Sequence, residues 1–162
     1  MIYKLYLLGA FLLMSCNSQP NNNAETLSRQ EKPEIQSIDL ISSEAGLISL
    51  QTNCYSCHNP NAESHEDMLA PPLAGIKFKY MSLYPEEEMF IKKMSDFVAM
   101  PSKENAVMKG PVKRFGLMPK PALEKKEIQE LVKYIYNNDL EIPKWFSGHF
   151  EEQHGVKWES KN

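Results

Sequence analysis

Two stretches of the chain repeat apolar residues at the spacing of an amphipathic helix. Each puts four of them on one helix face: Phe90, Met94, Phe97 and Val98 in the first stretch, and Ile128, Leu131, Val132 and Ile135 in the second. The first helix is expected to begin at Pro85 and to end before Pro101, and the second to cover about 124–137. A shorter helix is expected over 43–53, with Ser42 as its N-cap. No stretch sustains a period-two alternation, so the pattern predicts an all-α fold without a substantial sheet.

The N-terminus has the pattern of an export signal. A run of ten apolar or small residues from Leu5 to Met14 follows Lys4, and it is too short to span a membrane. The run ends in Leu13-Met14-Ser15-Cys16, which is similar to the lipoprotein box of bacteria. We therefore expect residues 1–15 to be a signal peptide and Cys16 to be the lipidated first residue, although ordinary cleavage with an unmodified Cys16 is the alternative. This predicts an exported, lipid-anchored protein that faces the periplasm.

Composition divides the rest of the chain into a tether, a domain and an extension. Residues 16–40 are rich in Asn, Gln, Ser, Pro and charge, which predicts a flexible tether. Residues 41–140 contain the periodic stretches and form the expected domain. Residues 141–162 form a C-terminal extension with four large aromatic residues: Trp145, Phe146, Phe150 and Trp158. We expect Trp145 and Phe146 to pack back on the domain, with docking to a partner as the alternative.

Charge is distributed unevenly along the chain. The 162 residues carry a net charge of −3, yet the segment 76–126 has eleven basic and six acidic residues. It contains no continuous basic run interleaved with aromatic residues, so nothing in it indicates nucleic-acid binding. A lysine-rich segment of this kind is either a solvated face or a positive surface that attracts acidic partners.

The motif with the most chemical content is Cys54-Tyr55-Ser56-Cys57-His58, a C-x-x-C-H sequence. In this pattern two thiols on one turn attach to the vinyl groups of one haem c, and the histidine supplies an axial nitrogen to the iron. A zinc half-site, a redox dithiol and a structural disulfide are the alternatives. Zinc would need further Cys or His residues at matching spacing, and a thioredoxin-type pair would need a βαβ pattern. Neither pattern is visible in the sequence, and the single motif predicts one covalent haem.

The order of these parts resembles the class I c-type cytochromes. A short helix, the C-x-x-C-H motif, a proline loop, a middle helix, a Met-Pro loop and a closing amphipathic helix follow one another over about 41–140. The resemblance implies a cytochrome c-like fold of three to five helices around the haem. It also implies that the first and last helices cross closely, with Gly46 against Tyr134 at the crossing. Only a residue without a side chain permits so close an approach.

The same resemblance suggests how the iron is held. His58 is the expected ligand on one face. The loop Phe115 to Pro121, which contains Met118-Pro119, resembles the family's ligand loop and implies Met118 on the other face. The alternatives are Met100, Met108, His149 and His154. In the loop Ala70 to Gly75 the resemblance implies that the Pro71 carbonyl accepts a hydrogen bond from His58, although a simple turn is an alternative. His65, His149 and His154 lie in polar contexts and are expected at the surface.

These expectations predict an electron-transfer protein rather than an enzyme. The resemblance implies a single-electron carrier of a bacterial respiratory or periplasmic chain. Its partners would be a terminal oxidase, a reductase or a dehydrogenase that docks transiently, and the lipid on Cys16 would hold it at the membrane. Two alternatives remain at this point. A displaceable sixth ligand would indicate a gas or redox sensor or a weak peroxidase, and the aromatic extension would suit a dedicated subunit of a larger oxidoreductase.

Overall fold

The computed structural model describes residues 43–159, so the expected signal peptide, Cys16, the tether and the Ser42 cap lie outside the described part of the chain. Residues 43–53 are helical. Five helices follow: α2 (Leu73–Leu83), α3 (Glu87–Ala99), α4 (Lys109–Phe115), α5 (Lys125–Asn137) and α6 (Phe146–His154). Residues 43–159 contain no β-strand. The predicted all-α fold is therefore confirmed, with five helices in the expected domain and the sixth in the extension.

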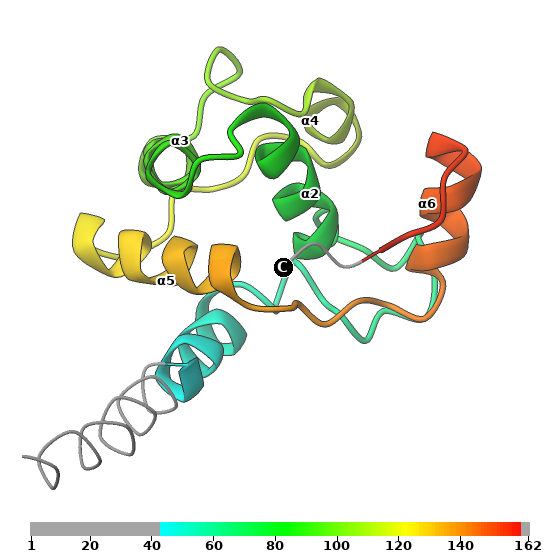
Figure 1. Cartoon of the computed structure of the whole chain (residues 1–162), viewed down its shortest axis with the longest axis horizontal. Helices are drawn as coiled ribbons and strands as arrows, with labels where there is room; N and C mark the ends of the chain where they lie inside the picture. The colour runs from blue at the N-terminus through cyan, green and yellow to red at the C-terminus, as the bar shows by residue number, and fades with distance from the viewer. Residues whose placement is uncertain (1–42, 160–162) are drawn as a thin grey trace, which may run out of the picture.

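The two stretches with helical periodicity form the centre of the core. Helix α3 packs against α5, and helix 43–53 (cyan in Figure 1) lies against the other side of α5. The fully buried side chains of the main core cluster come from these three helices and are Leu50, Phe90, Ile128, Val132 and Ile135. The apolar stripes that predicted the helices are therefore the surfaces on which they pack.

The ends of α3 and α5 follow from local electrostatics and hydrogen bonding. Helix α3 begins two residues after the predicted Pro85, and Glu87 and Glu88 in its first turn face the positive end of the helix dipole. Glutamate is a weak N-cap for α5, but the carboxylate of Glu127 accepts a hydrogen bond from the backbone N–H of Glu124 at 2.7 Å. This bond satisfies the backbone N–H of the N-cap residue itself, which the side chain of that residue cannot reach.

Helix α2 was not predicted because it is apolar on two sides. Leu73 and Tyr80 belong to the main core. Ala74 is buried in a second cluster with Phe146 and Phe150 of the extension, and Phe78 packs against that cluster. In Figure 1, α2 accordingly lies between α3 and α6. Because α2 contacts both neighbours, its sequence shows no single apolar stripe.

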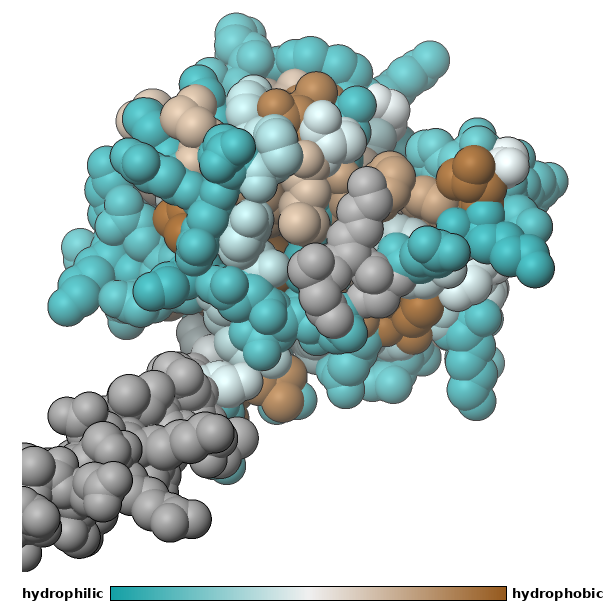
Figure 2. All heavy atoms as spheres, viewed as in Figure 1, coloured by the Kyte–Doolittle hydropathy of each residue, from teal (hydrophilic) through white to brown (hydrophobic). Residues whose placement is uncertain are grey.

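The aromatic extension packs on the domain, as expected. Phe146 and Phe150 are buried, and Trp145 and Trp158 pack against them. Figure 2 shows a mostly hydrophilic face, with a less hydrophilic strip over α2 where the two clusters adjoin. Among residues 43–159, no helix has the length and apolarity needed to cross a membrane.

Candidate haem-binding site

The C-x-x-C-H motif continues directly from helix 43–53 as one further turn. The backbone N–H of Cys54 donates to Leu50 O at 2.9 Å, and the N–H groups of Cys57 and His58 donate to Cys54 O at 3.1 and 2.9 Å. These bonds place both cysteines and the histidine on a single turn. Both thiols are free and partly buried, so neither is consumed by a disulfide between them.

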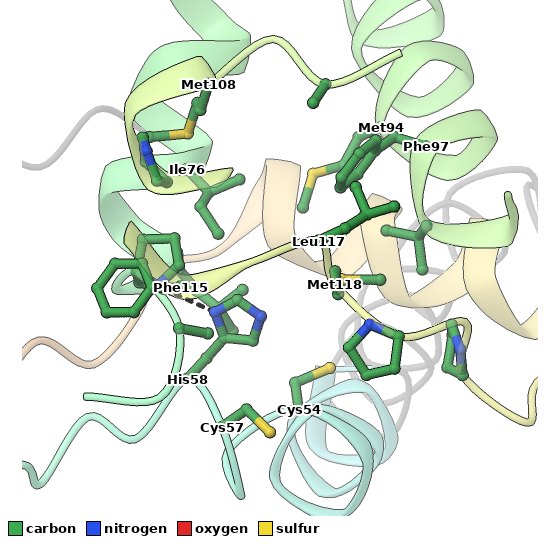
Figure 3. A pocket seen from close by; sticks show the side chains of 18 of the residues that line it. Cys54, Cys57, His58, Ile76, Met94, Phe97, Met108, Phe115, Leu117 and Met118 are labelled. Atoms are coloured by element: carbon green, nitrogen blue, oxygen red, sulfur yellow. Dashed lines mark hydrogen bonds between the residues drawn. The ribbon is translucent and has the colours of Figure 1, made fainter. Parts of the chain in front are cut away.

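The ring of His58 is fixed by a hydrogen bond to the loop that leads into α2. Its Nδ1 lies 2.6 Å from Pro71 O (dashed line in Figure 3). Because a carbonyl oxygen can only accept, Nδ1 must carry the hydrogen, which leaves a lone pair on Nε2. Burial lowers the pKa of His58, and the bond to Pro71 opposes this only in part. The imidazole is therefore a neutral ring with one nitrogen available as a metal ligand.

The Pro-Pro sequence explains why the Pro71 carbonyl is available and well oriented. Its own ring fixes φ of Pro71, and the following Pro72 restricts ψ of Pro71 to extended values. The first backbone bond of α2 runs from Ile76 N to Pro72 O at 3.2 Å. Pro71 lies one residue before Pro72, the N-cap of α2. The carbonyl oxygen of Pro71 is therefore not used by the helix and is free to accept from His58. The hydrogen bond that the sequence resemblance implied is present in the structure.

The motif opens onto an apolar cavity of about 330 Å³. Cys54, Cys57 and His58 line it together with Met118, and Figure 3 shows these four side chains around the same space. Most of the remaining wall is apolar and comes from α2, α3, α4, α5 and the loop after α4, with residues such as Ile76, Tyr80, Met94, Phe97, Phe115, Leu117 and Ile128. The volume and the lining are typical of a cofactor site.

The structure separates the alternatives for the second axial ligand. Met118 and Met108 line the cavity, and Met118 lies on the loop between α4 and α5. Met100 is 71% exposed and lies outside the lining. The other two alternatives, His149 and His154, belong to α6 and pack against aromatic rings there. Of the five candidates, only Met118 and Met108 share the cavity with His58.

The environment of Cys54 disfavours the thiolate that a zinc site would need. Burial, with a smaller contribution from Cys57, raises the pKa of Cys54 to about 11. A thiol of this kind stays protonated at neutral pH. Among residues 43–159, no three His, Cys, Asp or Glu side chains are arranged to hold a metal ion, whereas the zinc alternative needs four ligands.

Two of the three remaining histidines are less exposed than we expected. The rings of His65 and His149 are partly buried, with centroids 4.4 Å apart, and Trp145 packs against both. The surface expectation holds only in part for these two residues, because the extension covers the loop that contains His65. His154 is exposed, as expected, and its ring lies on Phe150.

The basic segment contributes unequally to the surface. Lys77 is buried, and its Nζ donates to Asn138 O at 2.9 Å, so it belongs to the helix packing. Lys92 forms an ion pair with Asp96 at 2.7 Å. Lys113 and Lys120 are exposed, and Lys120 also lines the cavity mouth. Of the eleven basic residues in this segment, only Lys120 lines the cavity, so their number does not measure the positive charge there.

Sequence reasoning missed the part of the cavity wall that α2 supplies. Ile76 and Tyr80 line the cavity from this helix. A signal for the helix was present, because Pro72 precedes Leu73 and proline is common at helix starts. The contact between Trp145 and Ala62 was also missed, and it had no local signal because the two residues are 83 positions apart.

The fold and site define a small all-helical domain with an attachment motif for a prosthetic group. A family model for cytochrome c matches residues 43–139, more than half of the chain. The chain belongs to the cytochrome c family, which supports a haem-based electron-transfer role. No curated protein and no solved structure matches the chain significantly.

The residues present fit the haem c that membership of this family implies. The cavity brings together two free thiols, a neutral imidazole with one available nitrogen, and a thioether, within apolar walls. Free thiols, an available imidazole nitrogen and apolar walls are what a covalently attached haem requires.

Proposed function

We propose that this protein is a monohaem class I cytochrome c that carries single electrons in a bacterial respiratory or periplasmic chain. Cys54 and Cys57 would hold one haem c through thioether bonds. His58 and Met118 would be the axial ligands, and Pro71 would orient His58. Haem iron with His and Met ligands supplies one-electron chemistry, and the thioether raises the reduction potential.

The observation that carries this proposal is that His58 and Met118 line one apolar cavity together with both cysteines. The remaining residues of the site hold the ligands in place and exclude water. Pro71 fixes the His58 ring at 2.6 Å, and the apolar walls keep water from the cavity. A site that keeps both ligands and excludes water changes little between two charge states, which suits electron transfer rather than substrate chemistry.

Carbon monoxide distinguishes a carrier from a sensor or peroxidase. The full-length protein, matured with haem and reduced, is exposed to carbon monoxide and its absorption spectrum is followed. An unchanged spectrum is expected, because Met118 keeps the sixth position. Met118→Ala is the positive control and should bind the gas. Rapid binding by the wild-type protein would favour the sensor or peroxidase alternative and contradict the carrier proposal.

We further propose that acidic redox partners, such as a terminal oxidase, a reductase or a dehydrogenase, dock beside the cavity mouth. Lys120 lines the cavity, and the exposed Lys113 belongs to α4, of which Val112 and Phe115 line it. They support this proposal, because positive charge near an exposed cofactor edge accelerates the approach of an acidic protein. Turnover with a membrane fraction from the native cell is expected to slow as ionic strength rises. Lys113→Gln/Lys120→Gln should weaken that dependence, with Lys133→Gln on α5 as the control. A rate independent of salt would contradict electrostatic docking.

The membrane anchor is proposed from the sequence alone. Cys16 would carry the lipid, and residues 16–40 would let the domain move above the periplasmic face of the membrane. Growth with labelled palmitate should label the wild-type protein and leave Cys16→Ser unlabelled. Label on both proteins or on neither would contradict lipidation at Cys16.

A further inference from the structure

The loop between the haem-attachment motif and α2 has little structure of its own. Residues 59–72 contain turns and bends but no helix. Its two internal backbone bonds are long, Ala62 N to Asn59 O at 3.4 Å and Asp67 N to Ser64 O at 3.3 Å. Its shorter side-chain bonds span only two or three residues, and from outside Arg114 donates to His65 O at 3.2 Å. The bond from His58 to Pro71 closes the loop across its two ends. A loop of this length without regular bonding needs contacts from elsewhere to stay in place.

The C-terminal extension supplies such contacts to the middle of the loop. The indole Nε1–H of Trp145 donates to Ala62 O at 3.0 Å, and Ala62 is buried. The ring of His65, also in the loop, lies against two side chains of the extension that also contact each other. Its centroid is 5.2 Å from that of Trp145 and 4.4 Å from that of His149. The extension therefore covers the outer side of the loop.

The extension also contacts the first turn of α2, directly after the Pro71 carbonyl. Phe146 is buried against Ala74. A Cβ built on Gly75 would lie 3.4 Å from two ring carbons of Phe146. The ring thus rests on the glycine four positions after Pro71. The C-terminal extension therefore contacts both the start of α2 and the loop that leads to it.

We propose that Trp145 and Phe146 are positioning residues for the axial histidine. They hold loop 59–72 and the first turn of α2 in place, so that the Pro71 carbonyl keeps the His58 ring in one orientation in both oxidation states. The extension then acts through Pro71 on the ligand and does not itself touch the iron site. This inference rests on the proposed function, in which His58 ligates the iron.

A pair of variants of the full-length holoprotein tests the proposal. Phe146→Ala removes the ring against Gly75. Phe150→Ala is the matched control. Phe150 is equally buried in the same cluster and also packs on Trp158, but its ring lies against Phe78, and none of its atoms is within 4 Å of a Cβ on Gly75. Amide hydrogen exchange over 59–72 measures the mobility of the loop. The paramagnetic NMR shifts of the ferric haem methyl groups report the orientation of the histidine ring, which a merely structural role would not change.

We expect Phe146→Ala to speed exchange in residues 59–72 about tenfold and to redistribute the methyl shifts, whereas Phe150→Ala leaves both close to wild type. If Phe146→Ala does not fold, Trp145→Phe takes its place with the same expectation, because it removes only the N–H donated to Ala62. Unchanged exchange and shifts in the tested variant, or equal changes in Phe150→Ala, would overturn the proposal. A wild-type ferric protein without histidine ligation would overturn the proposed function instead, so the two failures are distinct.

Discussion

Gly46 lies directly against the ring of Tyr134 where helix 43–53 crosses α5. A Cβ built on Gly46 would lie 2.7 Å from Cγ and 3.0 Å from Cβ of Tyr134, which is closer than carbon atoms approach. The crossing therefore requires glycine at this position. Because the C-x-x-C-H motif follows the same helix, this contact fixes where the attachment site begins relative to the core.

Gly46→Ala is expected to lower the free energy of unfolding by about 3 kcal/mol, because the added methyl group must push Tyr134 and α5 away. Denaturant unfolding of the holoprotein measures the change. Gly148→Ala in α6 is the control, since a Cβ there meets no atom within 4 Å, and it should leave the stability unchanged or raise it by up to about 1 kcal/mol. Equal effects of the two substitutions would contradict the close crossing.

Ser95 carries a buried hydroxyl in the core face of α3. Its Oγ has no hydrogen-bond partner within residues 43–159. An unsatisfied buried hydroxyl destabilises the folded state, so Ser95→Ala should raise the free energy of unfolding by about 1 kcal/mol. Thermal unfolding measures this, with the exposed Ser82→Ala as the control. A loss of stability in Ser95→Ala would show that the hydroxyl has a partner in solution.

His65 makes the docking of the extension sensitive to pH. Burial is the main reason that the pKa of His65 lies below its ordinary value of 6.5, and Arg114 and His149 lower it further, while Glu66 opposes them. The unfolded state therefore binds this proton more readily than the folded state. The contribution of His65 to stability is full above pH 6.5 and is lost as the pH falls below that value.

The melting temperature is accordingly expected to fall as the pH is lowered from 7.5 to 5.5. Protonation of His65 should account for part of this fall. In His65→Gln that part should disappear and the profile should flatten, whereas His154→Gln, at an exposed position, should keep the wild-type slope. Identical slopes in all three proteins would mean that the His65 ring is fully solvated.

The sequence alone predicted the helices that bury one face. Helices α3 and α5 each carry a single apolar stripe, because each has one core side. Helix α2 escaped prediction because it is apolar on both sides. One side, with Leu73 and Tyr80, faces the main core, and the other, with Ala74, faces Phe146. Helix α4 has only seven residues and includes Gly110 and Pro111, so its local propensity is weak.

The parts of the candidate site that consist of local motifs could be predicted from the sequence. The C-x-x-C-H motif, the Pro71-Pro72 pair and the Met118-Pro119 loop each occupy a few adjacent residues. The contacts from Trp145 to Ala62 and from His149 to His65 join segments more than 80 positions apart. Such contacts arise from tertiary packing and leave no periodic or spacing signal.

The most direct test of the account concerns Met118 and the iron. The oxidised protein, matured with haem, is examined for the weak far-red charge-transfer band that reports iron–sulfur ligation. We predict the band in the wild-type protein and in Met108→Ala, which alters the other alternative ligand that lines the cavity, and its loss in Met118→Ala. A wild-type protein without the band, or a band that persists in Met118→Ala, would contradict His58 and Met118 as the two axial ligands.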